Sequence, residues 1–326
     1  MTVTVGILGA ARIAPLALVH PARELDGIEV AAVAARAPAR AAAFAAEHAI
    51  PHVLRDYDQL VDDPRITAIY VPTPAALHGY WIRRAVDAGK HVLCEKPFTA
   101  NAAEALAIAE HTAGTPLVVM EAFHSLYHPS WATLSRLLAS GVIGEVRRAS
   151  ARFVVPHKDP TDIRWQLALG GGALMDLGVY PVRLLRYLFG TPEIRSAVAE
   201  HTLGVDSAMT VEFVFPGGIT AEAVASMRAH DQVGAELHVT GTSGTVHLRS
   251  PYHPHFAGQI TILTAAGSRI ETCDPRSTYS YQLQAFRDAI GGGAPVVTGA
   301  ADAAESMRLI DDTYLAAGMR PRVPLC

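Results

Sequence analysis

The sequence predicts two domains: an α/β domain built on a doubly wound parallel sheet, then an α+β domain with a large, mainly antiparallel open sheet. Through residues 1–122, short apolar strands alternate with alanine-rich helices. Residues 123–326 instead place several strands in succession without helices between them. A chain of 326 residues also suits two domains of about 150 residues each. We therefore expect the first domain at 1–122 and the second at 123–326.

The first strand is followed by a turn that could hold a dinucleotide. Residues 2–8 read as a strand, and Gly9 to Ala14 then opens a helix that runs to about Glu24. This is a degenerate form of the glycine-rich turn that binds a pyrophosphate. Gly9 can make the tight turn and Ala14 allows close packing, but Ala11 replaces the glycine at which a pyrophosphate approaches the backbone.

The next elements extend the parallel sheet and suggest which nicotinamide cofactor it binds. We expect a helix at 38–48, and strands at 28–35, 68–71, 91–94 and 117–120. The end of the second strand usually carries an acid that bonds the ribose of NAD. Arg36 stands there instead, with Arg40 one helical turn later, and a cation suits the 2'-phosphate of NADP. The predicted cofactor is therefore NADP, with NAD as the alternative.

Lys96 is the first candidate for chemistry. It comes directly after the strand at 91–94, and open parallel sheets bind ligands at the carboxyl ends of their strands. Pro97 restricts the backbone at this point, and Asn101 with Glu104 predicts a capped helix just beyond. His78 lies in the first turn of the preceding helix, where it could reach the cofactor or pack locally.

The second domain carries two further candidates on one predicted helix. That helix spans 174–189, and Asp176 and Tyr180 lie four residues apart on one face of it. The glycines at 170–172 favour close packing rather than a phosphate loop, because no buried strand precedes them. The other elements predicted here are a helix at 129–140, strands at 146–156, 196–203, 208–215, 219–227, 236–240, 245–248 and 259–264, and a last helix at 301–317 that could pack back on the first domain.

Composition narrows the class of partner. A net charge of −4 without basic blocks argues against nucleic acid, and no apolar run is long enough to span a membrane. The first ten residues lack a signal-type segment, so we expect a cytoplasmic protein that binds a small molecule. An open sheet with apolar strands such as 209–215 needs its second face covered, which predicts a homodimer or homotetramer.

The sequence shows no pattern of metal ligands. The cysteines Cys94, Cys273 and Cys326 have neither the spacing nor the even number of a zinc site or disulfide framework. His253 and His255 flank a proline without a carboxylate nearby, and the remaining histidines are scattered. We therefore expect no metal.

Five segments together resemble the Gfo/Idh/MocA family of nicotinamide-dependent oxidoreductases: residues 6–14 (GILGAARIA), 73–78 (TPAALH), 89–97 (GKHVLCEKP), 120–129 (MEAFHSLYHP) and 170–181 (GGGALMDLGVYP). The first and last are similar to the branch that holds glucose-fructose oxidoreductase, NADP-xylose dehydrogenase and dimeric dihydrodiol dehydrogenase. The resemblance implies catalytic or substrate-binding roles for Lys96, Asp176 and Tyr180. With the turn and strand ends, it implies cofactor contacts from Gly9, Ala11, Arg12, Ile13, Arg36, Arg40, Thr73, Pro74, His78, Glu95, Lys96, Glu121, Arg164 and Trp165. For Arg164 and Trp165, a wall beside the nicotinamide or substrate and simple packing remain alternatives.

The chemistry that this resemblance implies is hydride transfer between nicotinamide and a carbinol. The carbinol must lose its hydroxyl proton, and either Lys96 or Tyr180 could accept it. Asp176 would orient Lys96 or bind a substrate hydroxyl. We expect an aldose, polyol or glycoside as substrate, with a trans-dihydrodiol as the alternative. An NAD-dependent glycosidase or a non-catalytic cofactor-binding regulator are the competing readings from other classes.

Overall fold

The computed structural model describes residues 2–228 and 230–325, which form two compact units. The first unit comprises residues 1–124, 279–307 and 323–326, and the second comprises residues 125–278 and 308–322, apart from the positions outside the described ranges. The expected second domain of 123–326 thus differs from the observed unit, because residues 279–307 group with the first. Cys326 lies outside the described residues, while Cys94 and Cys273 are free thiols.

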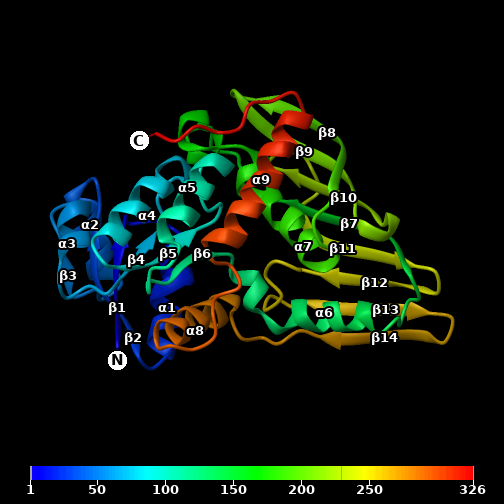
Figure 1. Cartoon of the computed structure of the whole chain (residues 1–326), viewed down its shortest axis with the longest axis horizontal. Helices are drawn as coiled ribbons and strands as arrows, with labels where there is room; N and C mark the ends of the chain where they lie inside the picture. Colours follow the sequence, from blue (N-terminus) through cyan, green and yellow to red (C-terminus); the bar gives the residue numbers. More distant parts are fainter. Residues whose placement is uncertain (1, 229, 326) are drawn as a thin grey trace. The chain divides into compact units, whose positions relative to one another are not determined.

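A six-stranded parallel sheet forms the core of the first unit, which confirms the predicted doubly wound class (Figure 1). Its order, β3-β2-β1-β4-β5-β6, reverses direction next to β1, where open α/β sheets bind their ligands. The central strands are buried along almost their whole length, as expected for a sheet covered on both faces. The strands are β1 (Val3–Leu8), β2 (Ile28–Ala34), β3 (His52–Val53), β4 (Ala68–Val71), β5 (His91–Glu95) and β6 (Val119–Ala122).

The helices of this unit follow the strands, but α3 (Tyr57–Asp62) was not predicted and the first helix begins later than expected. The helix expected directly after Gly9 begins only at Pro15, as a π-helical segment (η1, Pro15–Val19) that continues into α1 (His20–Glu24). Proline is favoured in the first turn, where its missing N–H would have no helical partner. The other helices are α2 (Pro38–Glu47), α3 (Tyr57–Asp62), η2 (Ala75–Leu77), α4 (His78–Asp87) and α5 (Ala102–Thr112). Asn101 caps α5 as predicted, because its side chain accepts a hydrogen bond from the Glu104 N–H.

The first unit also includes a helix that the sequence did not reveal, α8 (Thr278–Ile290), and the start of α9 (Ala300–Ala316). The Arg287 guanidinium donates to the Asp26 carbonyl at 2.8 Å, and the Ser280 hydroxyl lies 3.3 Å from Glu24. Farther along, the Glu121 N–H donates to the Thr298 carbonyl at 2.9 Å. These contacts explain why residues 279–307 group with the first unit.

The second unit is built on an eight-stranded sheet ordered β14-β13-β12-β11-β7-β10-β9-β8. Every neighbouring pair is antiparallel except β7 and β10, so the predicted mainly antiparallel open sheet is confirmed. The edge strand β14 was not predicted. The strands are β7 (Val146–Val154), β8 (Glu193–Thr202), β9 (Val205–Val214), β10 (Thr220–Ser226), β11 (Gly234–Gly241), β12 (Gly244–Arg249), β13 (Gln259–Thr264) and β14 (Gly267–Thr272).

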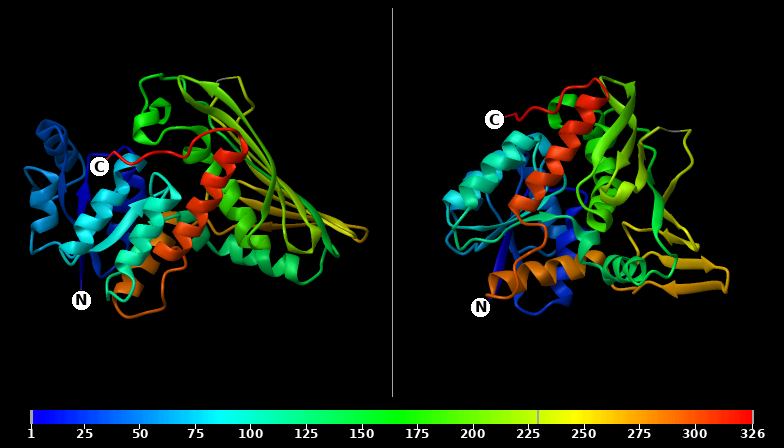
Figure 2. Two further views of the ribbon diagram at one scale, coloured as in Figure 1. Left: turned by 45° about the horizontal axis from the view of Figure 1, so that its top comes forward. Right: turned by 45° about the vertical axis from the view of Figure 1, so that its right-hand side comes forward.

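One face of this sheet carries the helices of its own unit. Figure 2 shows α6 (Pro129–Ala139) and α7 (Val179–Phe189) on the same side, where Trp131 and Tyr187 are in ring contact. The helix predicted as 174–189 begins with a π-helical segment, η6 (Leu174–Gly178), before α7. The short 3-10 segments of this unit are η3 (His124–Tyr127), η4 (Ile163–Trp165), η5 (Leu167–Leu169) and η7 (Pro216–Gly218).

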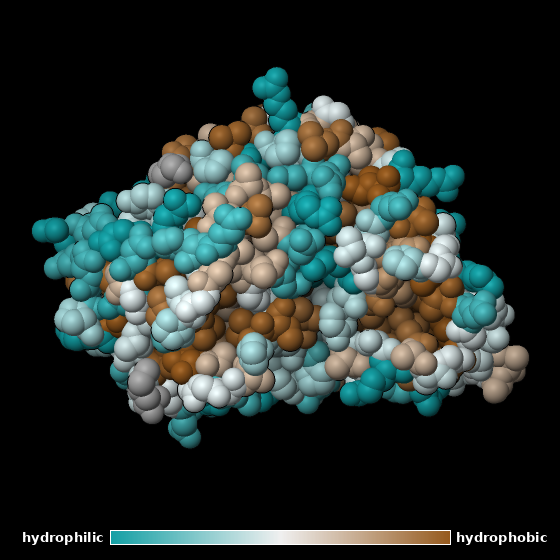
Figure 3. Space-filling view, in the orientation of Figure 1, coloured by the Kyte–Doolittle hydropathy of each residue, from teal (hydrophilic) through white to brown (hydrophobic). Residues whose placement is uncertain are grey.

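At the surface, apolar side chains form separate patches among polar ones (Figure 3). Within the described residues, no helix is both long enough and apolar enough to cross a membrane.

Candidate functional site

The turn after β1 has the backbone that a nucleotide-binding turn requires. Gly9 has a φ of 119°, in the region that favours glycine, and an added Cβ would lie 3.2 Å from the Tyr57 hydroxyl. The Ala11 N–H donates to the Gly9 carbonyl at 2.9 Å, and the Arg40 guanidinium donates to the Ala10 carbonyl at 3.1 Å. Arg12 is exposed, and Ile13 is half-buried before Ala14 enters the core.

Two arginines and a tyrosine gather beside this turn. Arg36 follows β2 and is exposed, and Arg40 lies in the first turn of α2. Burial raises the pKa of Tyr57, and the nearby charges of Arg36 and Arg40 oppose that rise. The sequence did not reveal Tyr57, because no local motif links residue 57 to the turn at Gly9.

The carboxyl end of β5 holds Lys96 on a backbone fixed by its neighbours. Glu95 is buried, and its carboxylate accepts a hydrogen bond of 2.6 Å from the hydroxyl of Tyr70 on β4. Burial, followed by the charge of Glu95, raises the pKa of Tyr70 well above its usual value, so this hydroxyl keeps its proton. Lys96 itself is half-buried. The strand end therefore presents the Lys96 side chain directly after a carboxylate that already has a partner.

His78 connects the loops that follow β4 and β5. Its Nδ1 lies 2.8 Å from the Pro97 carbonyl, and its Nε2 lies 2.6 Å from the Thr73 carbonyl. Burial lowers the pKa of this imidazole. These contacts support the local-packing alternative for His78, and its predicted contact with the cofactor stays a prediction.

The Thr73 hydroxyl fits a polar ligand at the same strand ends. Its oxygen is buried and has no hydrogen-bond partner among residues 2–228 and 230–325. Buried polar atoms without a partner are rare in native proteins, so this atom is a candidate contact for the nicotinamide half of a cofactor. Pro74, directly after it, is the residue that precedes η2.

Glu121 lies at the end of β6, and the first unit also contains Tyr279 of helix α8, which was not predicted. Glu121 is buried, and its carbonyl accepts a 2.7 Å hydrogen bond from the Thr298 hydroxyl. The rings of His124 and Tyr279 lie 4.1 Å apart. Burial, followed by the charge of Glu95, raises the pKa of the Tyr279 hydroxyl. Tyr279 could not be found from sequence because helix α8 was not predicted.

In the second unit, Asp176 is held by a basic network. The Arg164 Nε donates to the Asp176 carboxylate at 2.7 Å, and its Nη1 donates to Asp162 at 3.1 Å. The Nε2 of His157 lies 3.3 Å from the same Asp176 oxygen. Arg164, which we predicted to contact the cofactor, thus forms a hydrogen bond with Asp176, another predicted site residue. No local motif links His157 to Asp176, so the sequence did not reveal this contact.

Trp165 and the three glycines pack around this network. The Trp165 indole is buried and donates to the His157 carbonyl at 3.2 Å, which supports packing as one role for this ring. The Gly172 N–H donates to the Arg164 carbonyl at 2.9 Å. A Cβ on Gly171 would lie 2.5 Å from that same carbonyl, so a side chain there would clash with the backbone. The glycines allow close packing, as the sequence indicated.

Tyr180 lies in an aromatic cluster at the start of α7. Its ring is buried, 5.3 Å from both Phe153 and Tyr252 and 6.4 Å from His253. The Tyr252 hydroxyl is buried without a hydrogen-bond partner in the described part of the chain. Lys96 belongs to the first unit and Tyr180 and Asp176 to the second, so their joint action stays a prediction.

Two protein-family models match the chain, one over each of its two parts. The model of the "Oxidoreductase family, NAD-binding Rossmann fold" matches residues 3–123, and that of the "GFO/IDH/MocA C-terminal domain" matches residues 131–247. The chain belongs to the GFO/IDH/MocA oxidoreductase family. The predicted resemblance is therefore confirmed.

Relatives within the GFO/IDH/MocA family act on sugars and diols. D-xylose 1-dehydrogenase (NADP(+)) 2 of Haloferax volcanii is 34% identical over 95% of each chain. Trans-1,2-dihydrobenzene-1,2-diol dehydrogenase of Macaca fascicularis is 36% identical over 68% of this chain and 67% of its own. Among solved structures, the 3-ketoreductase KijD10 from Actinomadura kijaniata, in complex with NADP and TDP-benzene, superposes with a TM-score of 0.91 at 28% identity and covers 98% of both chains.

Proposed function

We propose that this chain is an NADP-dependent oxidoreductase that transfers a hydride between nicotinamide and a carbinol or carbonyl of an aldose, polyol or glycoside. The observation that carries the proposal is Lys96 at the carboxyl end of β5, on a backbone that Glu95 and His78 anchor. A strand end of this kind is where open α/β sheets place reacting ligands. The family and its sugar-oxidising members support the same reading.

The residues present fit the cofactor. Gly9 has the positive φ that the tight turn of a dinucleotide-binding fold requires, and the Thr73 hydroxyl has a buried oxygen to offer. Arg36 would pair with the 2'-phosphate, since its guanidinium is exposed at the end of β2. Bound there, NADP supplies the hydride acceptor or donor. Arg12, Ile13 and Glu121 remain proposed contacts on the strength of the family pattern.

The chain's own contribution to the chemistry is proton transfer and orientation. In the oxidative direction, Lys96 or Tyr180 takes the proton of the reacting hydroxyl, and in the reductive direction the same group returns it. The Arg164 hydrogen bond fixes the Asp176 carboxylate so that it can orient Lys96 or bind a neighbouring hydroxyl of the substrate. The buried packing of the Tyr180 ring restricts its motion, which favours a defined hydroxyl position. The base is left open between Lys96 and Tyr180.

A second candidate substrate is a trans-dihydrodiol, because a relative of that activity matches two thirds of the chain. A trans-dihydrodiol and a sugar both present adjacent hydroxyl carbons, so the same proton-transfer groups would serve either.

The test is incubation of the purified protein with NADP+ or NAD+ and a panel of aldoses, polyols, glycosides and a trans-dihydrodiol, followed by the absorbance of reduced nicotinamide. Net reduction of NADP+ by a sugar supports the proposal, and reduction by the dihydrodiol alone selects the second candidate. Glycoside cleavage without net reduction would identify a glycosidase. Tight NADP binding without any turnover would identify a regulator.

A further inference from the structure

The face of the second sheet opposite α7 carries a group of metal-ligating side chains that the sequence did not reveal. His238 on β11 is directly opposite His247 on β12 in the antiparallel register. Glu236 lies two residues before His238, so its side chain points to the same face. Strand pairing thus brings together two histidines that are nine residues apart and looked scattered in the sequence.

The donor atoms of these three residues are close enough to share one ion. One ligand atom from each of Glu236, His238 and His247 lies within 4.8 Å of the others. The two imidazole rings are stacked, with centroids 4.1 Å apart and an angle of 7° between their planes. The His238 Nε2 is 3.4 Å from the Glu236 carboxylate.

One of these donors lacks any other partner. The His247 Nε2 is buried and forms no hydrogen bond within residues 2–228 and 230–325. Buried side-chain nitrogens almost always have a partner, so an unsatisfied one inside a group of ligands indicates a binding site.

The two arginines beside Glu236 donate hydrogen bonds to backbone carbonyls and not to its carboxylate. In the register, Glu236 lies opposite Arg152 on one side and Arg249 on the other. However, the Arg152 guanidinium donates to the Gln232 carbonyl at 2.6 Å, and that of Arg249 donates to the Ala257 carbonyl at 2.9 Å. The Glu236 carboxylate instead lies 3.4 Å from the His238 Nε2.

We propose that Glu236, His238 and His247 bind a divalent transition-metal cation of the zinc class. Two imidazole nitrogens and one carboxylate oxygen form a donor set that zinc takes in proteins. Zinc-to-ligand distances of about 2.0 to 2.2 Å place tetrahedral ligands roughly 3.5 Å apart. His238 is exposed and Glu236 is half-exposed, so side-chain rotation closes the remaining separation.

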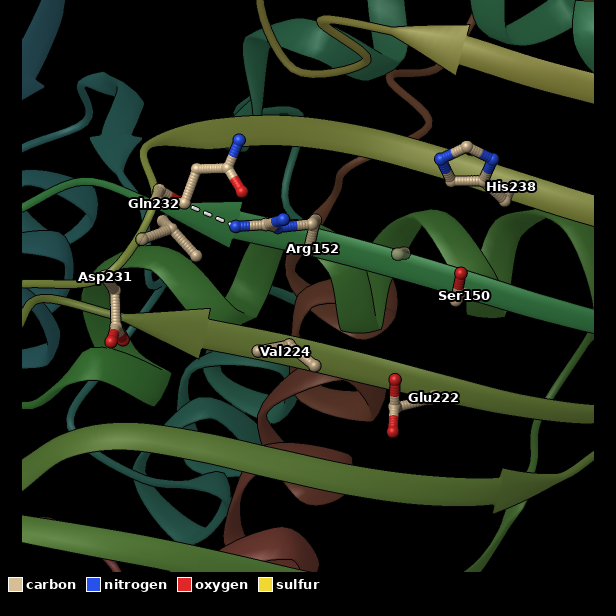
Figure 4. Close-up of a pocket in the computed structure, with 9 residues that line it drawn as sticks. Ser150, Arg152, Glu222, Val224, Asp231, Gln232 and His238 are labelled. Atoms are coloured by element: carbon tan, nitrogen blue, oxygen red, sulfur yellow. Dashed lines mark hydrogen bonds between the residues drawn. The ribbon is translucent and has the colours of Figure 1, made fainter.

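A pocket borders His238 on the side of β7. It measures about 380 Å³ and is bordered by Ser150, Arg152, Glu222 and His238 on the face shown in Figure 4. The ion would join β11 to β12 and thereby stabilise the sheet. This role is independent of the proposed oxidoreductase activity.

The test measures zinc binding to the full-length protein after treatment with a chelator. Calorimetric titration with Zn²⁺ should show one saturable equivalent for the wild type. His247→Gln and Glu236→Gln should each weaken that affinity at least about tenfold, because each removes one of three ligands. The matched control is His201→Gln, which removes an exposed imidazole of β8 in the same sheet and should bind like the wild type.

Thermal unfolding provides the second measurement. Zn²⁺ should raise the melting temperature of the wild type and of His201→Gln but not that of His247→Gln, because only ligands that bind the native state stabilise it. Comparison of the metal-free melting temperatures shows whether each variant folds. The proposal is overturned if the wild type shows no saturable binding, or if folded His247→Gln binds zinc as tightly as His201→Gln.

Discussion

Replacing Lys96 with methionine should abolish most of the turnover while leaving the cofactor bound. Methionine keeps the length of the side chain but removes the proton-transfer group, and loss of such a group lowers turnover by about 10²- to 10⁴-fold. At about 1.4 kcal/mol per tenfold change, this corresponds to about 3 to 6 kcal/mol of the barrier. The hydrogen bond of 2.6 Å between Tyr70 and Glu95 and the His78 contact with Pro97 do not involve the Lys96 side chain, so the loop and NADP affinity should persist.

Tyr180→Phe separates the two possible bases. Phenylalanine keeps the ring contacts of 5.3 Å with Phe153 and Tyr252, so only the hydroxyl is lost. The rate should fall less than in Lys96→Met if the lysine is the base, and about as much if the tyrosine is. If both act in one proton transfer, the double variant should lose less than the product of the two single losses.

The assay is single-turnover hydride transfer, with NADP binding measured separately for each variant. Lys158→Met is the matched control, because it removes an exposed lysine and should keep the wild-type rate. A normal rate in Lys96→Met, or fully additive losses in the double variant, would refute the joint role.

Three further predictions concern the cofactor, acid stability and assembly. Arg36→Asp should shift the ratio of dissociation constants from NADP toward NAD, because it replaces a phosphate-pairing cation with a ribose-pairing acid; an unchanged ratio would contradict the role of Arg36. A hydrogen bond from Arg65 lowers the pKa of Asp63 to about 2, so the folded state favours its ionised form. That stability is present above the unfolded pKa of 3.8 and is lost as the pH falls through about 2. Arg65 is largely exposed, so solvent screening limits the effect to about 1 kcal/mol. Urea unfolding at pH 7 and pH 3 should therefore show a smaller acid-induced loss in Asp63→Asn than in the wild type, and equal losses would exclude this pair as the cause. Finally, the second sheet carries exposed apolar side chains: Val198 is 65% exposed and Leu263 is 53% exposed. We therefore expect a homodimer or homotetramer that covers them. A monomeric mass by light scattering at micromolar concentration would contradict this expectation.

Much of the fold could be predicted because its signals are local. Buried parallel strands appear as short apolar runs, and the observed β4 coincides with the segment predicted in this way. The antiparallel strand β13 also coincides with its predicted segment. Asn101 identifies the start of α5 because capping depends on residues three apart. The two π-helical segments were missed, since Pro15–Val19 and Leu174–Gly178 have the same spacing of apolar residues as ordinary helices.

The sequence by itself determined the class of both sheets, the Gly9 turn, and the position of Lys96 after a strand. Each of these depends on residues that are adjacent in the chain. Only the tertiary structure decided which side chains surround them. Tyr57 reaches the Gly9 turn, Arg164 holds Asp176, and His247 meets His238 through strand pairing. Such contacts depend on sheet register and helix packing, which no local sequence motif specifies. A register shift of one residue would turn every side chain of a strand to the other face of the sheet.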